Sequence, residues 1–433
     1  MMRKVFLYIL IVLIFSLSVS AIALKEEEHP LFQYLSRPDP AYKWEKISDE
    51  KFPSGERLIK LKMTSQIWEG IKWEHELDII LPQKLENPSV AGLLITGSGR
   101  GGILEILRIV ANKTGIPMAV IFDIPNQPLF DGKTEDALLA YTFLRALETG
   151  DMSWPALYPM TKSVIRAMDT IQAISEKEWG KKVEKFVVTG ASKRGWTTWF
   201  TGIADNKRVI GIAPMVYDNL NIPAQMEQQL ACYGTYSEEI SDYTEAQLVQ
   251  RIGKDPVATA FSYCIDPYVL RFRATMPKFI INGSNDPYWT LESAHLYYPQ
   301  LIGEKHILYV PNAGHGLGDG IEAVSAIAAF ALARSRGEPL PAIRWIYEEV
   351  PEGLKLKIKP EGEPIKVKVW TASSDSLDFR KARWEPTELT GKEGIYEFIL
   401  KRPKEGYSAI FGEVRYKIDG IEYAQSTLPK IIR

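Results

Sequence analysis

Three side chains that together could activate a hydroxyl group for attack on a carbonyl carbon follow one another as Ser192, Asp286 and His315. A serine hydroxyl is a weak nucleophile until a base removes its proton, and a carboxylate must orient that base. In doubly wound hydrolases the nucleophile, acid and histidine come in this order, on loops after successive strands. The sequence therefore predicts nucleophilic catalysis by Ser192, with His315 as general base and Asp286 as orienting acid.

Ser192 lies in the segment Gly-Ala-Ser-Lys-Arg-Gly. Residues 185–188 are an apolar run typical of a buried parallel strand, and residues 196–201 indicate a helix packed on the sheet. A sharp turn flanked by Gly190 and Gly195 would hold the serine at the helix N-terminus, where free N–H groups favour an oxyanion. The second glycine comes one position later than in the usual nucleophile elbow, and a serine that only caps the helix is the alternative.

The acid and the base lie in loops that follow later predicted strands. Asp286 comes just after the strand 279–282, and His315 follows the strand 306–310 in a loop flanked by glycines. Both loops should therefore leave the same edge of the sheet as the serine. An aspartate before a proline can instead cap a helix, so Asp218, at the end of the strand after the elbow, is the alternative acid. The other four histidines lie before the sheet, in a helical stretch or at the start of a strand: His29, His75, His295 and His306.

An oxyanion needs N–H donors close to the serine. We expect one from Lys193 and a second from Gly97 or Ser98, in the glycine-rich loop after the strand 90–96. A phosphate cradle is the alternative for this loop, but the loop lacks the G-K-[ST] ending of a P-loop. The side chains of Lys193 and Arg194 could bind a substrate carboxylate or support the oxyanion, with Arg194 the candidate substrate-binding residue. A solvated or salt-bridged pair is the equally weighted alternative.

The elements that must position these residues predict an α/β fold. Apolar strands alternate with amphipathic helices, which indicates the doubly wound parallel sheet of an α/β-hydrolase over residues 24–338. An antiparallel hairpin over residues 58–80 precedes the parallel strands, and the polar residues 25–53 are expected to cover the surface. The alternation is lost over about residues 219–273, which we interpret as a helical cap. Short alternating strands in residues 339–433 predict an immunoglobulin-like β-sandwich.

Composition and the first residues bear on where the protein acts. The chain has 433 residues, with 52 basic and 54 acidic side chains and no basic block of the kind that nucleic acid requires. Residues 1–23 have the basic start, apolar core and A-x-A end of a secretory signal; their apolar run of about 15 residues is shorter than the ~20 that span a bilayer. We expect a secreted or periplasmic protein, in contact with a membrane only through an uncleaved signal. Cys232 and Cys264 could form one disulfide or remain separate thiols.

Motifs over most of the chain carry a family resemblance. They include Pro-Asn-Gln-Pro-Leu at 125–129, Gly-Asp-Met-Ser-Trp-Pro at 150–155, the elbow at 190–196, Tyr-Gly-Thr-Tyr-Ser at 233–237, and Asp378-Phe379-Arg380 with Trp384. These runs resemble the PhoPQ-activated pathogenicity-related proteins, which implies an exported protein with an α/β-hydrolase-like fold. The elbow also resembles that of glucuronoyl esterases, which attack esters of sugar acids. That second resemblance implies an oxyanion role for Lys193 and a carbohydrate ester as substrate.

We therefore predict a secreted serine hydrolase that cleaves an ester, or a peptide bond, through an acyl-enzyme and without a metal or organic cofactor. The expected partner is a small-molecule, carbohydrate or peptide ester, and the sequence does not indicate the oligomeric state. The alternative is a non-catalytic exported binding protein, or a virulence-related one, that keeps a hydrolase scaffold.

Overall fold

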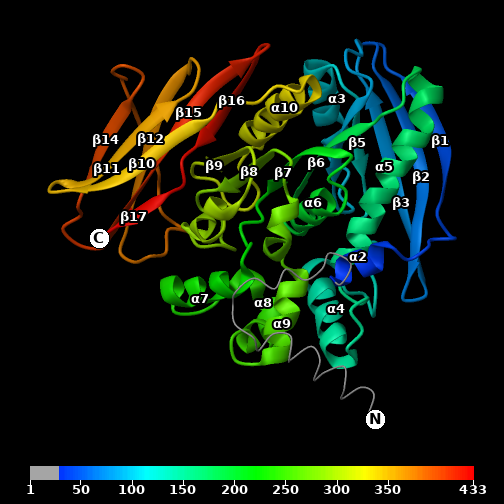
Figure 1. Ribbon diagram of the computed structural model, residues 1–433, viewed down its shortest axis with the longest axis horizontal. Helices are drawn as coiled ribbons and strands as arrows, with labels where there is room; N and C mark the ends of the chain where they lie inside the picture. The colour runs from blue at the N-terminus through cyan, green and yellow to red at the C-terminus, as the bar shows by residue number, and fades with distance from the viewer. Residues whose placement is uncertain (1–28) are drawn as a thin grey trace.

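A nine-stranded sheet runs through the centre of the molecule in the order β1-β2-β3-β5-β4-β6-β7-β8-β9 (Figure 1). The computed structural model describes residues 29–433. Strands β1 to β3 and β5 pair antiparallel, and all pairs from β5 to β9 are parallel. The strand bounds are β1 Lys43–Lys51, β2 Arg57–Trp68, β3 Ile71–Leu81, β4 Val90–Ile95, β5 Met118–Ile121, β6 Lys185–Ala191, β7 Val209–Met215, β8 Lys278–Gly283 and β9 Lys305–Val310. The expected α/β class is confirmed, and the sheet, expected to be a doubly wound parallel one after an antiparallel hairpin, is a large mixed sheet.

Alternate residues of the central strands enter two separate hydrophobic cores, one on each face of the sheet. In β6, Phe186 and Val188 belong to one core and Val187 to the other. Helices α3 (Ile103–Thr114) and α10 (Ile321–Arg336) contribute to the core that contains Val187. The other core takes in α4 (Glu135–Thr149), α5 (Leu157–Trp179) and α6 (Lys193–Ala204). Burial on both faces explains why these strands read as continuous apolar runs in the sequence.

The segment expected to form a cap contains helices and no strand, and all of its residues are described. Its elements are α7 Ile222–Tyr233, η2 Glu238–Ile240, α8 Ser241–Glu245, η3 Val249–Arg251, α9 Pro256–Ile265 and η4 Pro267–Arg273. The group of α7, α8 and α9 lies together with α4 at one end of the sheet (Figure 1). Contacts between α4 and both α8 and α9 join the segment to the body of the molecule.

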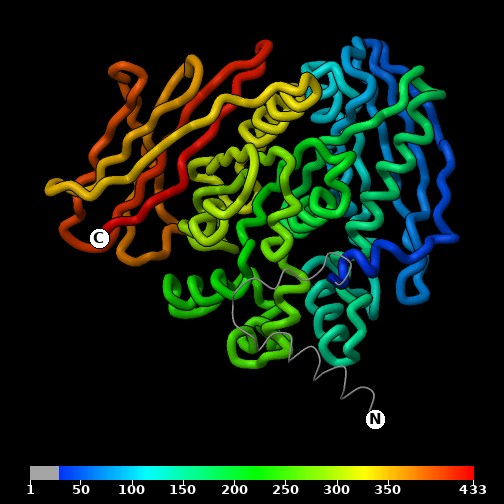
Figure 2. Tube along the Cα trace, in the orientation of Figure 1, coloured from blue at the N-terminus to red at the C-terminus, as the bar shows by residue number. Residues whose placement is uncertain are grey.

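The C-terminal strands form two further antiparallel sheets, beside β9 and α10 (Figure 2). One has the order β10-β11-β14; the other has the order β13-β12-β15-β16, with β17 on β15. Their bounds are β10 Ile343–Val350, β11 Gly353–Pro360, β12 Lys366–Ser374, β13 Glu385–Glu388, β14 Tyr396–Lys401, β15 Tyr407–Ile418, β16 Ile421–Ser426 and β17 Lys430–Ile432. The immunoglobulin-like assignment of this region stays a prediction.

Expectations for the N-terminal residues and for the two cysteines can be compared with the structure. Residues 25–53, expected to cover the surface, include α2 (Pro30–Leu35) and β1, an edge strand whose side chains are all at least partly exposed. An edge strand of this kind is polar because one of its sides has no partner strand. Cys232 and Cys264 are free thiols, so the disulfide alternative does not hold here. The predicted signal in residues 1–23 lies outside the described residues.

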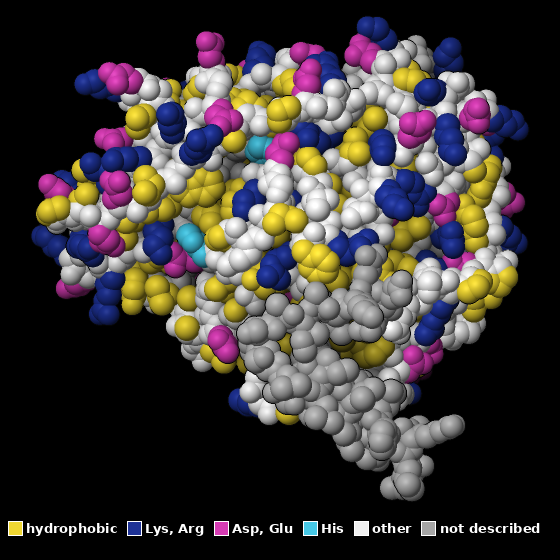
Figure 3. Space-filling view, viewed as in Figure 1, with side chains coloured by type: hydrophobic (Ala, Val, Ile, Leu, Met, Phe, Trp, Pro, Cys, Tyr) yellow, Lys and Arg dark blue, Asp and Glu magenta, His cyan; other side chains and the backbone are white. Residues whose placement is uncertain are grey.

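Charge is spread over the visible surface without a single-sign block. Figure 3 shows lysine and arginine side chains interspersed with aspartate and glutamate over the face it presents. Within residues 29–433, every helix is too short or too polar to cross a membrane.

Candidate active site

Ser192 sits at the turn between β6 and α6, with φ 57° and ψ −126°. A residue with a side chain rarely adopts this backbone conformation, and such strain concentrates at functional sites. The N–H of Ser192 donates to the carbonyl of Met215 on β7 at 2.9 Å, and its carbonyl accepts the N–H of Trp196 at 3.0 Å. The serine is therefore held in a half-buried corner between a buried strand and the first turn of a helix.

The late glycine of the elbow is explained by where α6 crosses the sheet. A Cβ on Gly195 would lie 2.8 Å from the Met215 carbonyl oxygen and 3.0 Å from Cβ of Tyr217. A Cβ on Gly190 would lie 2.8 Å from the Arg194 carbonyl oxygen. Both positions require the absence of a side chain because backbone atoms occupy the space. The G-x-S-x-x-G spacing therefore gives the close strand–helix contact that a nucleophile elbow needs.

The loops that carry the predicted acid and base leave neighbouring strands at the same edge. The last pair in the register of β8 and β9 is Gly283 with Val310. A Cβ on Gly283 would lie 2.3 Å from the Ala313 carbonyl oxygen, so the two loops pack backbone against backbone. The N–H of Asn285 donates to that same carbonyl at 2.9 Å. This packing fixes the acid loop against the histidine loop.

Asp286 and His315 form a directly hydrogen-bonded pair. Nδ1 of His315 lies 3.0 and 2.9 Å from the two carboxylate oxygens of Asp286, which is buried. The Tyr288 ring stacks on the imidazole with 4.1 Å between ring centroids. The backbone N–H of Tyr288 donates to the Asp286 carboxylate at 3.0 Å. A carboxylate at Nδ1 selects the tautomer whose Nε2 can accept a proton.

Nε2 of His315 is buried and has no hydrogen-bond partner among the described residues. Ser192 is consequently not hydrogen-bonded to it in this structure. Ser192 itself is half-buried and lines the cavity described below, as Tyr288 does. Nucleophile–base contacts are often long in the absence of substrate and tighten in the complex.

The predicted oxyanion donors lie next to the serine in the strand register. Across β4 and β6, Ile95 pairs with Gly190, so the loop that begins at Gly97 runs alongside the turn at Ser192. The carbonyl of Gly97 accepts the N–H of Asp123 at 3.0 Å, and Ser98 is exposed. Lys193 is the first residue of α6, where backbone N–H groups have no partner inside the helix.

The two basic side chains after the serine are both in salt bridges. The Arg194 guanidinium binds Glu135 through two nitrogens at 2.6 and 2.7 Å, and its Nε donates to the Ile124 carbonyl. Nζ of Lys193 lies 2.8 Å from Glu135 and 3.3 Å from Asp136. Burial opposes ionisation of Glu135, but Arg194 and Lys193 outweigh it and hold the pKa of Glu135 well below its usual range. Of the alternatives stated above, the structure shows the salt-bridged one, and it places Arg194 beneath the Gly97 loop.

Asp218, the alternative acid, lies in a separate buried network. The hydroxyls of Tyr297 and Tyr309 donate to its two carboxylate oxygens. Burial raises the pKa of Asp218 to about 7, although the two tyrosine hydrogen bonds act in the opposite direction. The carboxylate at Nδ1 of His315 is that of Asp286 and not Asp218.

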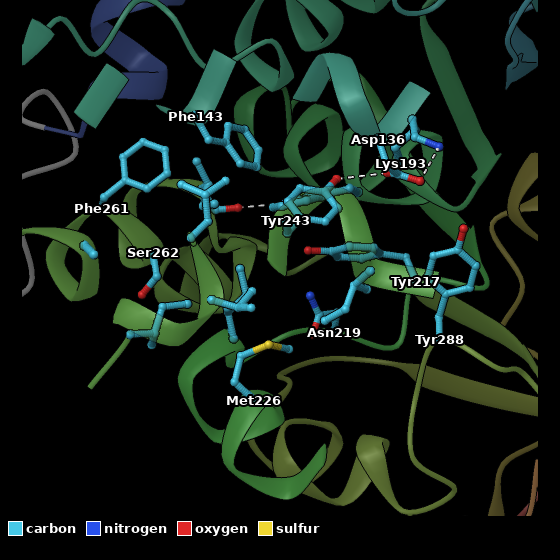
Figure 4. A pocket seen from close by; sticks show the side chains of 18 of the residues that line it. Asp136, Phe143, Lys193, Tyr217, Asn219, Met226, Tyr243, Phe261, Ser262 and Tyr288 are labelled. Carbon is cyan, nitrogen blue, oxygen red and sulfur yellow. Dashed lines mark hydrogen bonds and ion pairs between the residues drawn. The ribbon is translucent and has the colours of Figure 1, made fainter. Parts of the chain in front are cut away.

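A cavity that is partly open to solvent extends from Ser192 under the cap helices; its empty space, together with that of its open mouth, is about 790 Å³. Its wall is mainly apolar and aromatic, with Lys193 and Asp136 at one end (Figure 4). Phe143 of α4, Met226 of α7 and Phe261 of α9 line it. The predicted cap thus shapes the space beside the serine.

Sequence reasoning missed two asparagines that tie the site to the C-terminal strands. Nδ2 of Asn285 donates to the carbonyls of Phe379, Arg380 and Ala382, at 3.2, 3.2 and 2.7 Å. Asn312 exchanges two hydrogen bonds with the backbone of Trp384, at 2.9 and 2.7 Å. Each asparagine lies close in sequence to a predicted catalytic residue. The motif Asp-Phe-Arg with its later tryptophan was the available signal, but its contact with these loops depends on the tertiary fold.

Three comparisons place the chain among known proteins. The family model described as "PhoPQ-activated pathogenicity-related protein" matches residues 31–380. Autocrine proliferation repressor protein A of Dictyostelium discoideum is 33% identical over 427 residues, covering 89% of this chain and 86% of that protein. Acetyl xylan esterase 1 of a Thermoanaerobacterium species matches with a TM-score of 0.52 and 16% identity, over 70% of this chain and 93% of that one. An acetyl xylan esterase of a Paenibacillus species matches with a TM-score of 0.50 and 14% identity, over 70% and 95%. At such identities the structural matches show a shared fold.

Proposed function

The chain belongs to the PhoPQ-activated pathogenicity-related protein family, and from this membership and the geometry around Ser192 we propose that it is a serine esterase. The observation that carries the proposal is the strained Ser192 turn at the sheet edge from which the Asp286–His315 pair also projects. The fold shared with two acetyl xylan esterases supports an ester as substrate, in preference to a peptide bond.

In the proposed reaction, Oγ of Ser192 attacks the ester carbonyl carbon while Nε2 of His315 takes its proton. The carboxylate of Asp286 orients the imidazole and stabilises its cationic form. The N–H of Lys193 and one from the Gly97–Ser98 loop donate to the oxyanion. His315 then gives the proton to the departing alkoxide. Water hydrolyses the acyl-enzyme by the same steps, with Nε2 again as base. The proposed reaction requires that Oγ of Ser192 and the unpaired Nε2 of His315 come within hydrogen-bond distance when substrate binds.

A fluorophosphonate probe tests this proposal, because it labels only an activated serine. The wild-type protein should be labelled and should hydrolyse p-nitrophenyl esters, whereas Ser192→Ala should do neither. Labelling of Ser192→Ala equal to that of the wild type would assign the reactivity to another residue. The absence of labelling in a folded wild-type protein would reject an active esterase.

A second candidate is a non-catalytic exported protein that keeps the scaffold. Two observations favour it: the Dictyostelium relative is named for repression of proliferation, and Ser192 is not hydrogen-bonded to His315 here. The same labelling experiment separates the two candidates, since a binding protein has no need of an activated serine.

Export and domain organisation complete the proposal. Residues 1–23 act as a cleaved signal, so the secreted or periplasmic protein should begin at residue 24, which N-terminal sequencing checks. Residues 24–338 form the hydrolase domain, with residues 219–273 as its cap, and residues 339–433 form an immunoglobulin-like sandwich. The break between α10, which ends at Arg336, and β10, which begins at Ile343, supports this boundary.

A further inference from the structure

We infer that the cavity beside Ser192 binds the acyl part of the ester, and that this acyl group is bulky, apolar and uncharged. The inference rests on the proposed esterase function and specifies its substrate class. It differs from what the acetyl xylan esterases suggest by their names, since an acetyl group is too small to contact the side chains that α4, α6 and the cap together contribute to the wall.

The wall of the cavity has the composition of a binding site for an apolar ligand. Aromatic and aliphatic side chains from α4, α6 and the cap surround it, including Phe143, Trp196, Met226, Leu248, Phe261 and Ile265. Lining side chains come from α4, α6, α7 and α9, and Tyr288 and Trp289 add to them, so a ligand in the cavity meets apolar groups on several sides. Each methylene group moved from water into such a wall contributes about 0.8 kcal/mol of binding free energy, or a factor of about four.

Several polar groups in the wall are engaged with the protein. The Ser262 hydroxyl donates to the Thr259 carbonyl at 2.7 Å, and the Trp196 indole donates to the Ile265 carbonyl at 2.7 Å. The Tyr243 hydroxyl donates to Asp136 at 2.9 Å (Figure 4). Two polar atoms of the wall, the Tyr217 hydroxyl and Oδ1 of Asn219, are buried without a hydrogen-bond partner among the described residues. Apart from these two neighbouring atoms, the wall leaves little demand for a polar substituent on the ligand.

The charges at the end of the cavity near Ser192 balance. Lys193 and Arg194 supply two cations, and Glu135 and Asp136 supply two carboxylates in direct contact with them. A substrate carboxylate at this end would compete with two resident carboxylates for the same cations. The cavity therefore favours an uncharged acyl group over that of a sugar acid.

The position of His315 assigns the cavity to the acyl side of the ester. The leaving alcohol must reach the imidazole to receive its proton. Ser192 lines the cavity, whereas His315 is not among the described residues that line it. A group in the cavity thus contacts the nucleophile but not the base, as the acyl group of an acyl-enzyme does. The alcohol then leaves on the side of the imidazole.

A series of p-nitrophenyl esters that differ only in the acyl group tests this inference. For the wild-type protein, kcat/KM should rise at least about 10-fold from acetate to hexanoate or octanoate. Benzoate and cinnamate esters tell whether a linear or an aromatic acyl group fits better. The octyl ester of acetic acid, with the chain on the alcohol side, should gain no such advantage.

Two substitutions on α9 provide a matched pair. Ala258 lines the cavity, so Ala258→Phe should lower the ratio of octanoate to acetate activity at least about 10-fold. Ala260 lies on the same helix but is not a lining residue, and Ala260→Phe should leave that ratio unchanged. If Ala258→Phe does not fold, the kcat/KM values of the wild-type protein for the acyl-ester series still test the inference.

The two proposals fail in different ways. A wild-type protein that takes the fluorophosphonate label but prefers acetate to every longer acyl ester is an esterase without the inferred acyl site. Equal loss of octanoate activity in both alanine variants would also overturn the inference. A folded wild-type protein that takes no label refutes the esterase function itself.

Discussion

At the scale of single residues, two buried aspartates near the sheet edge have distinct environments that assign them distinct roles. Asp286 accepts from His315, and Asp218 accepts from two tyrosine hydroxyls. We expect Asp286→Asn to lower kcat about 10³–10⁴-fold, because an amide would favour the wrong imidazole tautomer. Asp218→Asn should change kcat by less than about threefold. The asparagine keeps one oxygen that can accept from a tyrosine hydroxyl, and this side chain does not contact His315. Steady-state kinetics on the two purified variants checks this; the reverse ranking would make Asp218 the acid.

A third buried aspartate predicts a pH dependence of stability. Burial, with Glu76 nearby, raises the pKa of Asp78 to about 7 from 3.8, and its carboxylate oxygens have no hydrogen-bond partner among the described residues. At pH values between 3.8, the ordinary pKa that applies to the unfolded chain, and about 7, the folded protein binds more protons at this site than the unfolded chain does. The free energy of unfolding therefore falls as pH rises from about 4 to about 7.

Asp78→Asn removes this titration. At each pH, the free energy of unfolding of the wild type is subtracted from that of the variant. This difference should be about 1–3 kcal/mol larger at pH 8 than at pH 5. Urea unfolding at the two pH values measures the difference. The exposed Asp375 offers a control, because Asp375→Asn should shift the free energy of unfolding equally at both pH values.

At the scale of elements, the contact between α6 and the strands depends on one glycine. In Gly195→Ala, the new methyl group would meet the Met215 carbonyl and the Tyr217 side chain, and neither can move without displacing β7 or the loop after it. We expect a loss of about 1–3 kcal/mol in the free energy of unfolding and a fall in activity, because the helix carries the Lys193 N–H. Gly101→Ala, where nothing lies within 4 Å of the added carbon, should leave the thermal midpoint unchanged.

The central elements could be predicted from the sequence because their patterns are local. The strand before Ser192 and the loops with Asp286 and His315 are each bounded by apolar runs and glycines, and the structure places all three at one edge. The edge strand β1 was missed because its exposed side chains carry no apolar alternation. The partner of Arg194 was left open because Glu135 lies 59 residues away, and only the tertiary fold brings them together.

At the scale of the whole molecule, the C-terminal strands hold the loops of the proposed site in place. The connection between β12 and β13 reaches Asn285 next to the acid, Asn312 near the base, and the cap through Arg380, which pairs with Glu238 at 2.8 Å. The Arg380 guanidinium also lies 4.2 Å from the centre of the Tyr233 ring. One connection of the C-terminal region therefore contacts the acid loop, the base loop and the cap together.

This arrangement predicts that removing either amide will misplace the acid–base pair without touching it. In Asn312→Ala, the Trp384 backbone loses both of its bonds to this side chain, and the loop ahead of His315 is released. We expect kcat to fall about 10–100-fold with a smaller change in KM, because small displacements of a catalytic group carry costs of that order.

Gln425 is the control: its amide joins β16 to Pro341 and to His306 at the start of β9, away from the site. Gln425→Ala should lower the thermal midpoint but keep kcat. If both variants lose stability and neither loses kcat, the C-terminal strands stabilise the fold without positioning the site.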